Sequence, residues 1–598
     1  MEQIMNQNWD LASLYPDETM SNKLLELRAE LDMTIETLSE NLKQLNRSSG
    51  IIKLSKLVKF IQRTQYVQNG SEEFDDLLIC IYAQNTNNTE VIGLLDHSAV
   101  IKSKLQSIQL ELNLTLANLS EDLWAELLRL SEVDPIAFYL LECRQKGKEQ
   151  LPLEMERLIS SLSINGIKGL EQHYEQMLTK IRIPLKMDGE IKEVSIGQAL
   201  NEAIYAKNRL VRQDAALAIK HICEKNADLF ASVLNRIAGF RLTIYEQRGW
   251  DNLLKELCLQ NRIMDETLQT MLTSINKHKE LIKSYIQRKI ELGQIKNPSW
   301  FDLESPHFTV AVKVPYQDAV TLIIEQFETF SDSLGKFAEE AFEADWIETE
   351  NRPSKAEGGF CASFPLSKQS RIFLTYRENY QDVITIAHEL GHAYHNYILH
   401  KEPAFAQQKG TSLAETASTF MENLVVDAVI KQTTSKEEKL ALLEMKISNG
   451  LKYVGTIPNM FKFEQEFYEK RKANVVTAEE INTLISKAEN ELYDGLIEDL
   501  AVHKWMYISH FYNAEKAFYN IPYTIGYLFS NGIYERLKNS ENGVEQLNEL
   551  LRSSGRMTVE QLAERYLGVD ATKTTFWDRS LQPLREAIEE YLYLTEDI

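Results

Sequence analysis

A His-Glu-x-x-His pattern near the middle of the chain constrains the fold more than any other feature. His388 and His392 are four residues apart, so on a helix they lie on one face, where two ring nitrogens can bind one metal ion. Glu389 lies one step round the helix, where its carboxylate can take a proton from a zinc-bound water. The apolar residues recur at helical spacing, namely Val383, Ile386, Ala387, Leu390 and Tyr394. The stretch 384–395 therefore predicts a helix that carries a metal site.

The pentapeptide by itself leaves a second interpretation open. Patterns of five residues occur by chance, and two histidines on a helix can be ordinary hydrogen-bonded core or surface residues. The apolar context favours the metal, because a histidine without a partner is costly to bury. A metal ion bound to both rings removes that cost.

A third ligand is expected, because catalytic zinc usually has three protein ligands and a water. Glu415 is the candidate, since the stretch 412–422 reads as a second amphipathic helix and Glu415 lies on or beside its apolar face. The alternative is a capping box with Ser412 at the N-cap; beside the histidine pair we favour the ligand. Glu422 lies two turns further on the same side. It is either a hydrogen-bond partner for a ligating histidine or an ordinary surface charge.

These motifs carry a resemblance to a known family. His-Glu-Leu-Gly-His at 388–392 and Leu-Ala-Glu-Thr-Ala-Ser at 413–418 resemble the thimet-oligopeptidase family of zinc metallopeptidases, and more narrowly its bacterial oligoendopeptidase F branch. The resemblance spans nearly the whole chain, because further stretches agree with it: 9–11, 300–303, 358–361 and 518–523. It implies a mainly α-helical, multi-helix metallopeptidase with two helical halves around a deep channel. It also implies a small β-sheet beside the zinc helix.

Composition and charge narrow the function further. The 598 residues are 44% hydrophobic and 26% charged, as in ordinary globular proteins. The net charge of −23 argues against nucleic acid or an anionic membrane surface as a partner. We expect no targeting segment at the start and no membrane span, since no stretch approaches roughly 20 apolar residues. The five scattered cysteines are expected to be free thiols in a reducing cytoplasm.

Three regions are expected along the chain. Residues 1–110 are helical, with leucines near heptad spacing that indicate a buried helical hairpin and a polar turn at 84–88. Residues 111–196 form a second helical unit, which resembles the N-terminal subdomain of the oligopeptidase family. This unit ends in a small hairpin over 183–194 with an Asp188-Gly189 turn. Residues 197–598 form the catalytic domain, and no linker separates the three regions.

A β-hairpin is expected just before the metal helix. The stretches 358–364 and 371–376 read as strands around a polar turn at 368–370. Such a hairpin can present an open strand edge beside the metal, to which a peptide adds through main-chain hydrogen bonds. Paired glycines favour close backbone approach, although a purely structural hairpin fits these residues equally well. The predicted substrate contacts are Gly358, Gly359 and Phe360.

A histidine and several tyrosines gather near the C-terminus. His510 is followed by Tyr519, Tyr523 and Tyr527, and Pro522 and Gly526 predict that part of this region is a loop. Aromatic residues at such spacing are usually core. The resemblance implies instead that a histidine and tyrosine cluster here faces the zinc. For a donor to the oxyanion beside His510 we choose Tyr523 first and Tyr519 second, while Tyr527 can be packing.

Taken together, the sequence predicts a cytoplasmic zinc endopeptidase that hydrolyses internal bonds of short oligopeptides. One zinc ion per chain is held by His388, His392 and Glu415; Glu389 is the general base and a zinc-activated water the nucleophile. A non-catalytic peptide-binding protein of the same fold is one alternative, which the intact motif argues against. A zinc hydrolase of non-peptide substrates is another. The sequence does not specify cleavage preference or oligomeric state.

Overall fold

The computed structural model describes residues 5–15, 20–47, 53–187, 189–309 and 313–598. Helices dominate, with two small sheets, so the prediction of a mainly α fold is confirmed. The chain divides into two compact units, each assembled from three separate stretches. The first unit comprises residues 1–153, 312–429 and 529–570, and the second comprises 154–311, 430–528 and 571–598. The boundaries at 429 and 528 fall inside helices.

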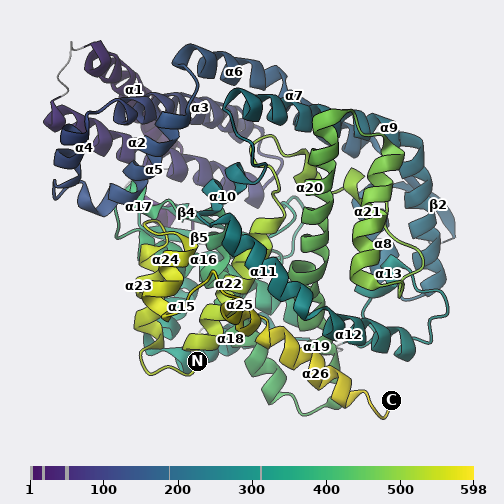
Figure 1. Cartoon of the computed structure of the whole chain (residues 1–598). Coiled ribbons are helices and arrows are strands. Elements are labelled where there is room, and N and C mark those ends of the chain that lie inside the picture. Colours follow the sequence, from purple (N-terminus) through teal and green to yellow (C-terminus); the bar gives the residue numbers. More distant parts are fainter. Residues whose placement is uncertain (1–4, 16–19, 48–52, 188, 310–312) are drawn as a thin grey trace. The chain divides into compact units, whose positions relative to one another are not determined.

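The first unit begins with three long helices that lie side by side (Figure 1). They are α1 (Met20–Arg47), α2 (Leu54–Gln84) and α3 (Thr89–Ala117). The leucine repeat of α1 is buried, which confirms the predicted helical hairpin, and the polar stretch 84–88 is the turn between α2 and α3. The remaining helices of this unit are shorter: η1 (Ala12–Leu14), α4 (Glu121–Leu128), η2 (Asp134–Ile136), α5 (Ala137–Glu149), α14 (Tyr316–Phe330), α15 (Asp332–Glu343), α16 (Tyr380–Leu399), α17 (Ala404–Gln407), η3 (Thr411–Glu415), α18 (Thr416–Gln432), α23 (Gly543–Ser553), α24 (Val559–Leu562) and η7 (Ala563–Leu567).

A three-stranded sheet in this unit has the order β3-β5-β4. β3 (Ile347–Glu348) pairs parallel to β5 (Gln369–Phe373), and β4 (Phe360–Phe364) pairs antiparallel to β5. The predicted hairpin therefore exists, but the prediction of its turn at 368–370 is wrong. The turn is 365–368, and Ser370 pairs with Ser363 inside the sheet. The left-handed backbone of Lys368 (φ 54°) ends the turn, and pairing begins at Gln369, two residues earlier than polarity suggested.

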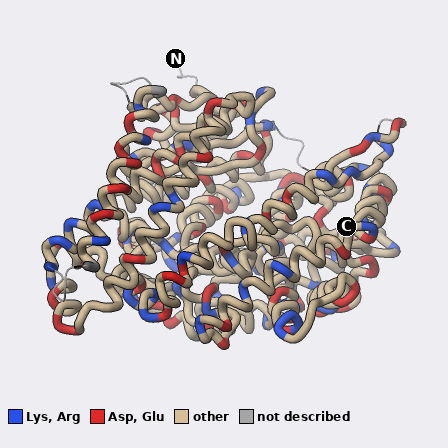
Figure 2. The backbone as a smooth tube through the Cα atoms, turned by 90° about the horizontal axis from the view of Figure 1, so that it is seen from above, with Lys and Arg blue, Asp and Glu red and all other residues tan. Residues whose placement is uncertain are grey.

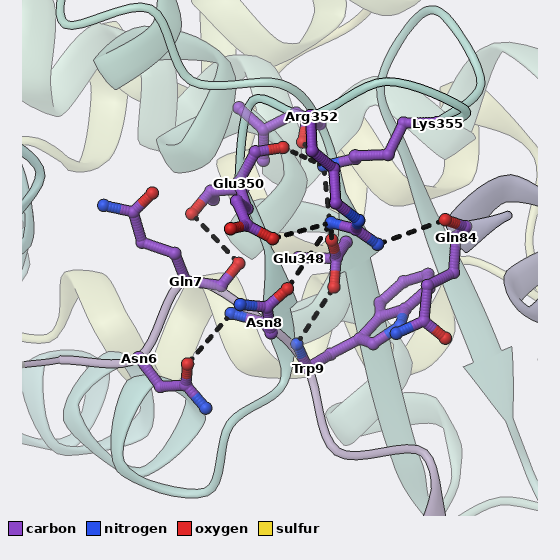
Figure 3. Close-up of polar contacts among 11 residues, drawn as sticks. Asn6, Gln7, Asn8, Trp9, Gln84, Glu348, Glu350, Arg352 and Lys355 are labelled. Atoms are coloured by element: carbon purple, nitrogen blue, oxygen red, sulfur yellow. Dashed lines mark hydrogen bonds and ion pairs between the residues drawn. The ribbon is translucent and has the colours of Figure 1, made fainter.

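A buried carboxylate fastens the N-terminal segment to this sheet (Figure 3). Glu348 on β3 is fully buried and accepts the N–H of Trp9 at 3.3 Å. It also binds Arg352 and lies 3.4 Å from Lys355. Lys355 in turn donates to the carbonyl oxygen of Leu374 at 2.8 Å. The loop that leads into β4 is thus tied to the N-terminal segment and to β5.

The second unit is built around the 39-residue helix α9 (Arg209–Gln247). The predicted small hairpin is present as β1 (Ile183–Met187) and β2 (Glu190–Val194); of its predicted turn, Asp188 lies outside the described residues and Gly189 has φ +87°. The other helices are α6 (Leu153–Asn165), α7 (Ile167–Lys180), α8 (Ile196–Tyr205), α10 (Lys255–Asn261), α11 (Asp265–Lys277), α12 (Lys279–Leu292), α13 (Trp300–Glu304), α19 (Lys436–Leu451), η4 (Lys452–Thr456), α20 (Ile457–Ala473), α21 (Ala478–Tyr493), η5 (Lys504–Met506), η6 (Ser509–Tyr512), α22 (Ile521–Leu537), α25 (Thr574–Ser580) and α26 (Gln582–Leu594).

Charged residues of both signs are interspersed along the helices (Figure 2). The acidic excess of the sequence is therefore distributed over many elements. Across the described ranges, no helix is both long and apolar enough to cross a membrane.

Candidate metal centre

The predicted metal-binding helix is α16 (Tyr380–Leu399). Its N-cap is Asn379, whose Oδ1 accepts the N–H of Asp382 at 3.0 Å, so a free helix amide is satisfied. Residues such as Ile386 and Leu390 are fully buried and anchor the helix in the first unit. The side of the helix that carries His388 and His392 stays half-buried. Helical periodicity in the sequence is thus sufficient to predict this element.

Three potential ligands meet at one point. His388 Nε2 lies 3.3 Å from Glu415 Oε2, and His392 Nε2 lies 3.5 Å from the same oxygen. The two imidazole centroids are 4.9 Å apart at an interplanar angle of 82°. One ligand atom from each side chain lies within 4.8 Å of the other two. Nitrogen and carboxylate donors in this number are the usual protein ligands of catalytic zinc.

A close helix crossing brings these ligands together, and the sequence reading missed it. A Cβ atom added to Gly391 would lie 2.5 Å from Ser418 Cα and 2.7 Å from Ala417 O. Only a glycine therefore allows α16 to approach α18 so closely at this position. The sequence does contain the relevant residue, because Gly391 lies inside the His-Glu-x-x-His pattern.

Glu415 ends a short 3₁₀ turn, η3 (Thr411–Glu415), which leads into α18 (Thr416–Gln432). The prediction of one continuous helix over 412–422 is therefore wrong at its start. Ser412 lies inside the turn and Gly410 takes the cap position, so the capping-box alternative does not apply. Instead, the Oγ of Ser418 donates to Glu415 Oε2 at 3.0 Å. The turn directs this carboxylate toward α16.

Glu422 lies two helical turns beyond Glu415, as expected. Its Oε2 lies 3.3 Å from His388 Nδ1, the ring nitrogen that faces away from Glu415. A carboxylate in this position fixes the orientation of a ligating imidazole and increases its basicity.

The ionisation of these groups suits a cation. Burial lowers the pKa of His392 to about 4, so its ring is neutral at pH 7, the form that binds metals. Burial also acts to lower the pKa of His388, but hydrogen bonds to Glu415 and Glu422 outweigh it and raise this pKa. For Glu415, burial acts to raise the pKa, and the hydrogen bond and charges of the two imidazoles bring it below its usual range. The cluster therefore stabilises positive charge.

Glu389 lies beside the cluster and differs from Glu415. It is only 7% exposed, and burial raises its pKa to about 7, with the charge of His388 lowering and that of Glu415 raising it. Within the described part of the chain, its Oε2 has no hydrogen-bond partner. A buried carboxylate with a free oxygen and a pKa near neutrality is suited to accept and release a proton.

The strand β4 borders this carboxylate. A Cβ atom at Gly359 would lie 3.7 Å from Glu389 Oε1 and 3.5 Å from Thr385 Cγ2. Gly358 has φ +94°, a conformation that side chains disfavour. At the other end of β4, Asp76 on α2 accepts the N–H of Ser363 at 2.6 Å. The edge of β4 is thus occupied at Ser363, while the start of the strand follows Gly359 beside Glu389.

The predicted histidine and tyrosine cluster forms within the second unit. The ring of His510 lies 4.9 Å from that of Tyr519 and 5.8 Å from that of Tyr523. Tyr527 stacks on Tyr453 at 4.6 Å, in agreement with a packing role. A loop is present up to Asn520, but the prediction that Pro522 and Gly526 interrupt the helix is wrong, because α22 starts at Ile521 and continues through Gly526. Pro522 is tolerated because it occupies the first turn.

The chain is similar to several known proteins. A profile described as peptidase family M3 matches residues 203–583, and one described as Oligopeptidase F matches residues 116–182. An oligoendopeptidase F homolog of Lactococcus lactis is 24% identical over 397 residues, which is 65% of this chain and 65% of the relative's length. A peptidase structure from Chlamydophila abortus superposes with a TM-score of 0.81 at 19% identity over 99% of both chains. Oligoendopeptidase-F from Enterococcus faecium gives 0.71 at 18%, over 95% of this chain and 99% of that one.

Proposed function

Because the chain belongs to peptidase family M3, we propose that it is a zinc-dependent endopeptidase of short oligopeptides. The observation that carries this function is the convergence of His388, His392 and Glu415 within 4.8 Å, with the free carboxylate oxygen of Glu389 beside them. The names of the relatives, oligoendopeptidase F among them, support a substrate made of peptide bonds.

The three ligands fit one zinc ion per chain. Two imidazole nitrogens and one carboxylate oxygen are hard to borderline donors that zinc accepts, and three protein ligands leave one position open. When bound, zinc supplies a Lewis acid that lowers the pKa of water and polarises a carbonyl group. Glu422 holds the Nδ1 side of the His388 ring, which would leave the Nε2 atom of His388 available to hold the ion.

Glu389 is the proposed general base. Its free oxygen takes a proton from the attacking water, and the same carboxyl group then delivers that proton to the amine that leaves. Because burial places its pKa at about 7, both transfers are feasible near neutral pH. The neighbouring Gly359 has no side chain that would occupy the space beside this carboxylate.

The substrate backbone is proposed to bind along β4. The proposed contacts are at the start of this edge, beside Glu389, and comprise Gly358, Gly359 and Phe360. Main-chain pairing at a strand edge tolerates many substrate side chains. Asp76 already binds the Ser363 amide, so a bound peptide pairs with the start of the strand only. Such backbone recognition suits an enzyme that cuts peptides of varied sequence.

His510 and Tyr523 are proposed to stabilise the oxyanion of the transition state, with Tyr519 as the second candidate. An imidazole N–H and a phenol O–H are donors of the kind that stabilise such charge. The family resemblance and the clustering of the three rings within about 6 Å support this role. The deep channel between helical halves rests on the resemblance alone. A cytoplasmic location is supported by the five free cysteines.

A quenched fluorescent peptide of about ten residues tests the function. The purified enzyme should cleave it at an internal bond, lose activity with a chelator and recover with added zinc. A chelator-resistant activity would contradict the metal mechanism, and a zinc-loaded, folded protein without activity on any peptide would contradict the endopeptidase function.

A further inference from the structure

The loop between η6 and α22 carries an unusual backbone conformation next to a proposed catalytic side chain. Phe518 has φ 54°, and a bulky residue in the left-handed region is disfavoured unless its surroundings impose it. Tyr519 follows directly, with its ring against His510. The conformation of Phe518 therefore sets the direction in which the chain presents Tyr519.

One helix holds both the backbone and the ring of Phe518. Glu464 on α20 accepts the Phe518 N–H with its Oε1 atom at 3.0 Å. The ring of Phe518 packs against Phe461, at 5.6 Å, and Tyr468, at 5.2 Å. Phe461, Glu464 and Tyr468 are spaced by three and four residues, so they form one face of α20. The Phe518 conformation is thus imposed from a single rigid element.

Burial of the Glu464 carboxyl group next to Phe518 costs desolvation free energy. It is 3% exposed, burial raises its pKa to about 8, and its Oε2 has no hydrogen-bond partner among the described residues. An apolar side chain of the same size would fill this space without a desolvation cost. What the carboxyl group supplies, and an apolar side chain cannot, is the acceptor for the Phe518 amide.

The other end of the loop is fixed by a second buried residue. Arg241 on α9 is 5% exposed and donates to the carbonyl oxygen of Asn513 and, at 2.9 Å, to Tyr468 Oη. The side chain of Asn513 closes a turn by accepting the N–H groups of Glu515 and Lys516 at 3.1 and 2.7 Å. The loop is therefore pinned at residue 513 and at residue 518.

Building on the transition-state role given to His510 and Tyr519 above, we propose that Glu464 is a positioning residue for the reaction. From α20 it fixes the Phe518 amide and thereby aims Tyr519 beside His510. It does not touch the substrate. Because a misplacement of about 1 Å in a catalytic group costs up to about 10²-fold in rate, this buried hydrogen bond should be visible in catalysis.

Two substitutions at this position separate positioning from bulk stability. Glu464→Met keeps the length of the side chain but removes the acceptor, and we expect kcat of the zinc-loaded enzyme to fall about 10- to 100-fold with little change in KM. Glu464→Gln keeps an oxygen acceptor and should restore most of kcat. Asn513→Ala, which opens the turn at a half-buried site without disturbing the buried carboxyl group, should lower kcat in the same way even if Glu464→Met does not fold.

Asn235→Leu is the matched control. Asn235 is also buried in the second unit and accepts a backbone N–H, that of Val476, at 2.8 Å. Its loss should lower the melting temperature and leave kcat unchanged. A second measurement is the NMR spectrum of histidine-labelled enzyme, in which the His510 ring resonance is identified by its absence in His510→Ala. The chemical shift of this resonance should change in Glu464→Met and stay the same in Asn235→Leu.

The outcomes are distinguishable from failure of the proposed function. In one outcome, the parent cleaves peptide and both Tyr519→Phe and His510→Ala lower kcat, so the proposed function stands. If folded Glu464→Met and Asn513→Ala then turn over normally, positioning by Glu464 is refuted. If Glu464→Gln is as impaired as Glu464→Met, the acceptor is not what matters and positioning is again refuted. If Tyr519→Phe and His510→Ala are both fully active, the transition-state role fails, and the positioning role with it.

Discussion

The pKa values of two carboxyl groups at the candidate metal centre are shifted in opposite directions because their neighbours differ. Glu389 is buried and its Oε2 has no hydrogen-bond partner among the described residues, and burial raises its pKa to about 7. Glu415 lies between two imidazoles, and its pKa is held below the usual range. One side chain can therefore exchange a proton near neutrality, and the other keeps the negative charge that a cation needs.

Replacement of the proposed base should separate chemistry from metal binding. Glu389→Gln keeps the shape of the side chain but cannot accept a proton, so we expect kcat to fall by about 10²–10⁴-fold. Zinc content, measured by metal analysis, should stay near one ion per chain. Near-normal turnover in a preparation free of parent enzyme would remove Glu389 from the mechanism.

The third ligand is tested by metal retention. Glu415→Ala reduces three ligands to two, and after dialysis the protein should contain much less than one zinc per chain. Glu422→Gln is the graded comparison, because it disturbs only the outer partner of His388 and should weaken zinc affinity about 10- to 100-fold. Full zinc retention by Glu415→Ala would exclude Glu415 from the site.

At the scale of elements, the crossing of α16 and α18 depends on one missing side chain. Gly391→Ala would force a methyl group to within 2.5 Å of Ser418 Cα, and such overpacking costs about 1–3 kcal/mol or more. We expect a lower melting temperature together with weaker zinc binding. Gly93→Ala is the control, since Gly93 lies inside α3 with no atom within 4 Å of the added methyl group, and it should stabilise by about 0.5–1 kcal/mol. Equal melting temperatures for the two variants would argue against a tight crossing.

The contact between Asp76 of α2 and Ser363 of β4 should make the free energy of unfolding depend on pH. Burial raises the pKa of Asp76 to about 7, while its bond to the Ser363 amide lowers it and nearby Glu72 raises it. The folded state therefore keeps a proton that the unfolded chain releases above about pH 4. This stabilising contribution is complete below pH 4 and is lost as the pH rises through 7.

Asp76→Asn keeps an acceptor for Ser363 and has no charge to bury. Its melting temperature, relative to the parent, should increase from pH 5 to pH 8. A difference in melting temperature between variant and parent that stays the same from pH 5 to pH 8 would show that the pKa of Asp76 is not raised in the folded protein.

Local pattern predicted the elements better than the contacts between them. The apolar period of 384–395 is enough for α16, and two strand-like stretches around a polar turn are enough for the β4–β5 hairpin. The 3₁₀ turn before α18 was missed because it depends on how η3 packs, and the hairpin turn was displaced because register is set by the whole sheet. Likewise, the ligands were identified by residue type and spacing, whereas Gly391, Asp76 and Glu464 act through partners far away in the sequence.

At the scale of the whole molecule, the mainly helical fold followed from the sequence, but the division into units did not. Each unit joins three stretches that are distant along the chain, and no linker composition marks where the chain passes from one to the other. Two of the boundaries, after residues 429 and 528, fall within α18 and α22, which are continuous helices in the structure. Only long-range contacts reveal them.

The proposed channel is tested by substrate size. If the metal lies deep between helical halves, extended oligopeptides reach it and a folded protein does not. A ladder of peptides incubated together with a stably folded globular protein should show cleavage of the peptides only. Efficient cleavage of the folded protein would refute the channel, and a heat-unfolded sample of the same protein serves as the control for sequence.

The interleaved course of the first unit also sets the order in which a newly made chain can mature. Tyr394 and His395 of the metal helix bind Asn548 and Ser554, and Thr416 at the start of α18 binds Ser530. A ribosome that has just finished residue 422 has therefore produced every proposed ligand but none of these supports. We therefore expect α16 and α18, and with them the proposed ligands, to reach their final positions only after the segment 529–570 has emerged.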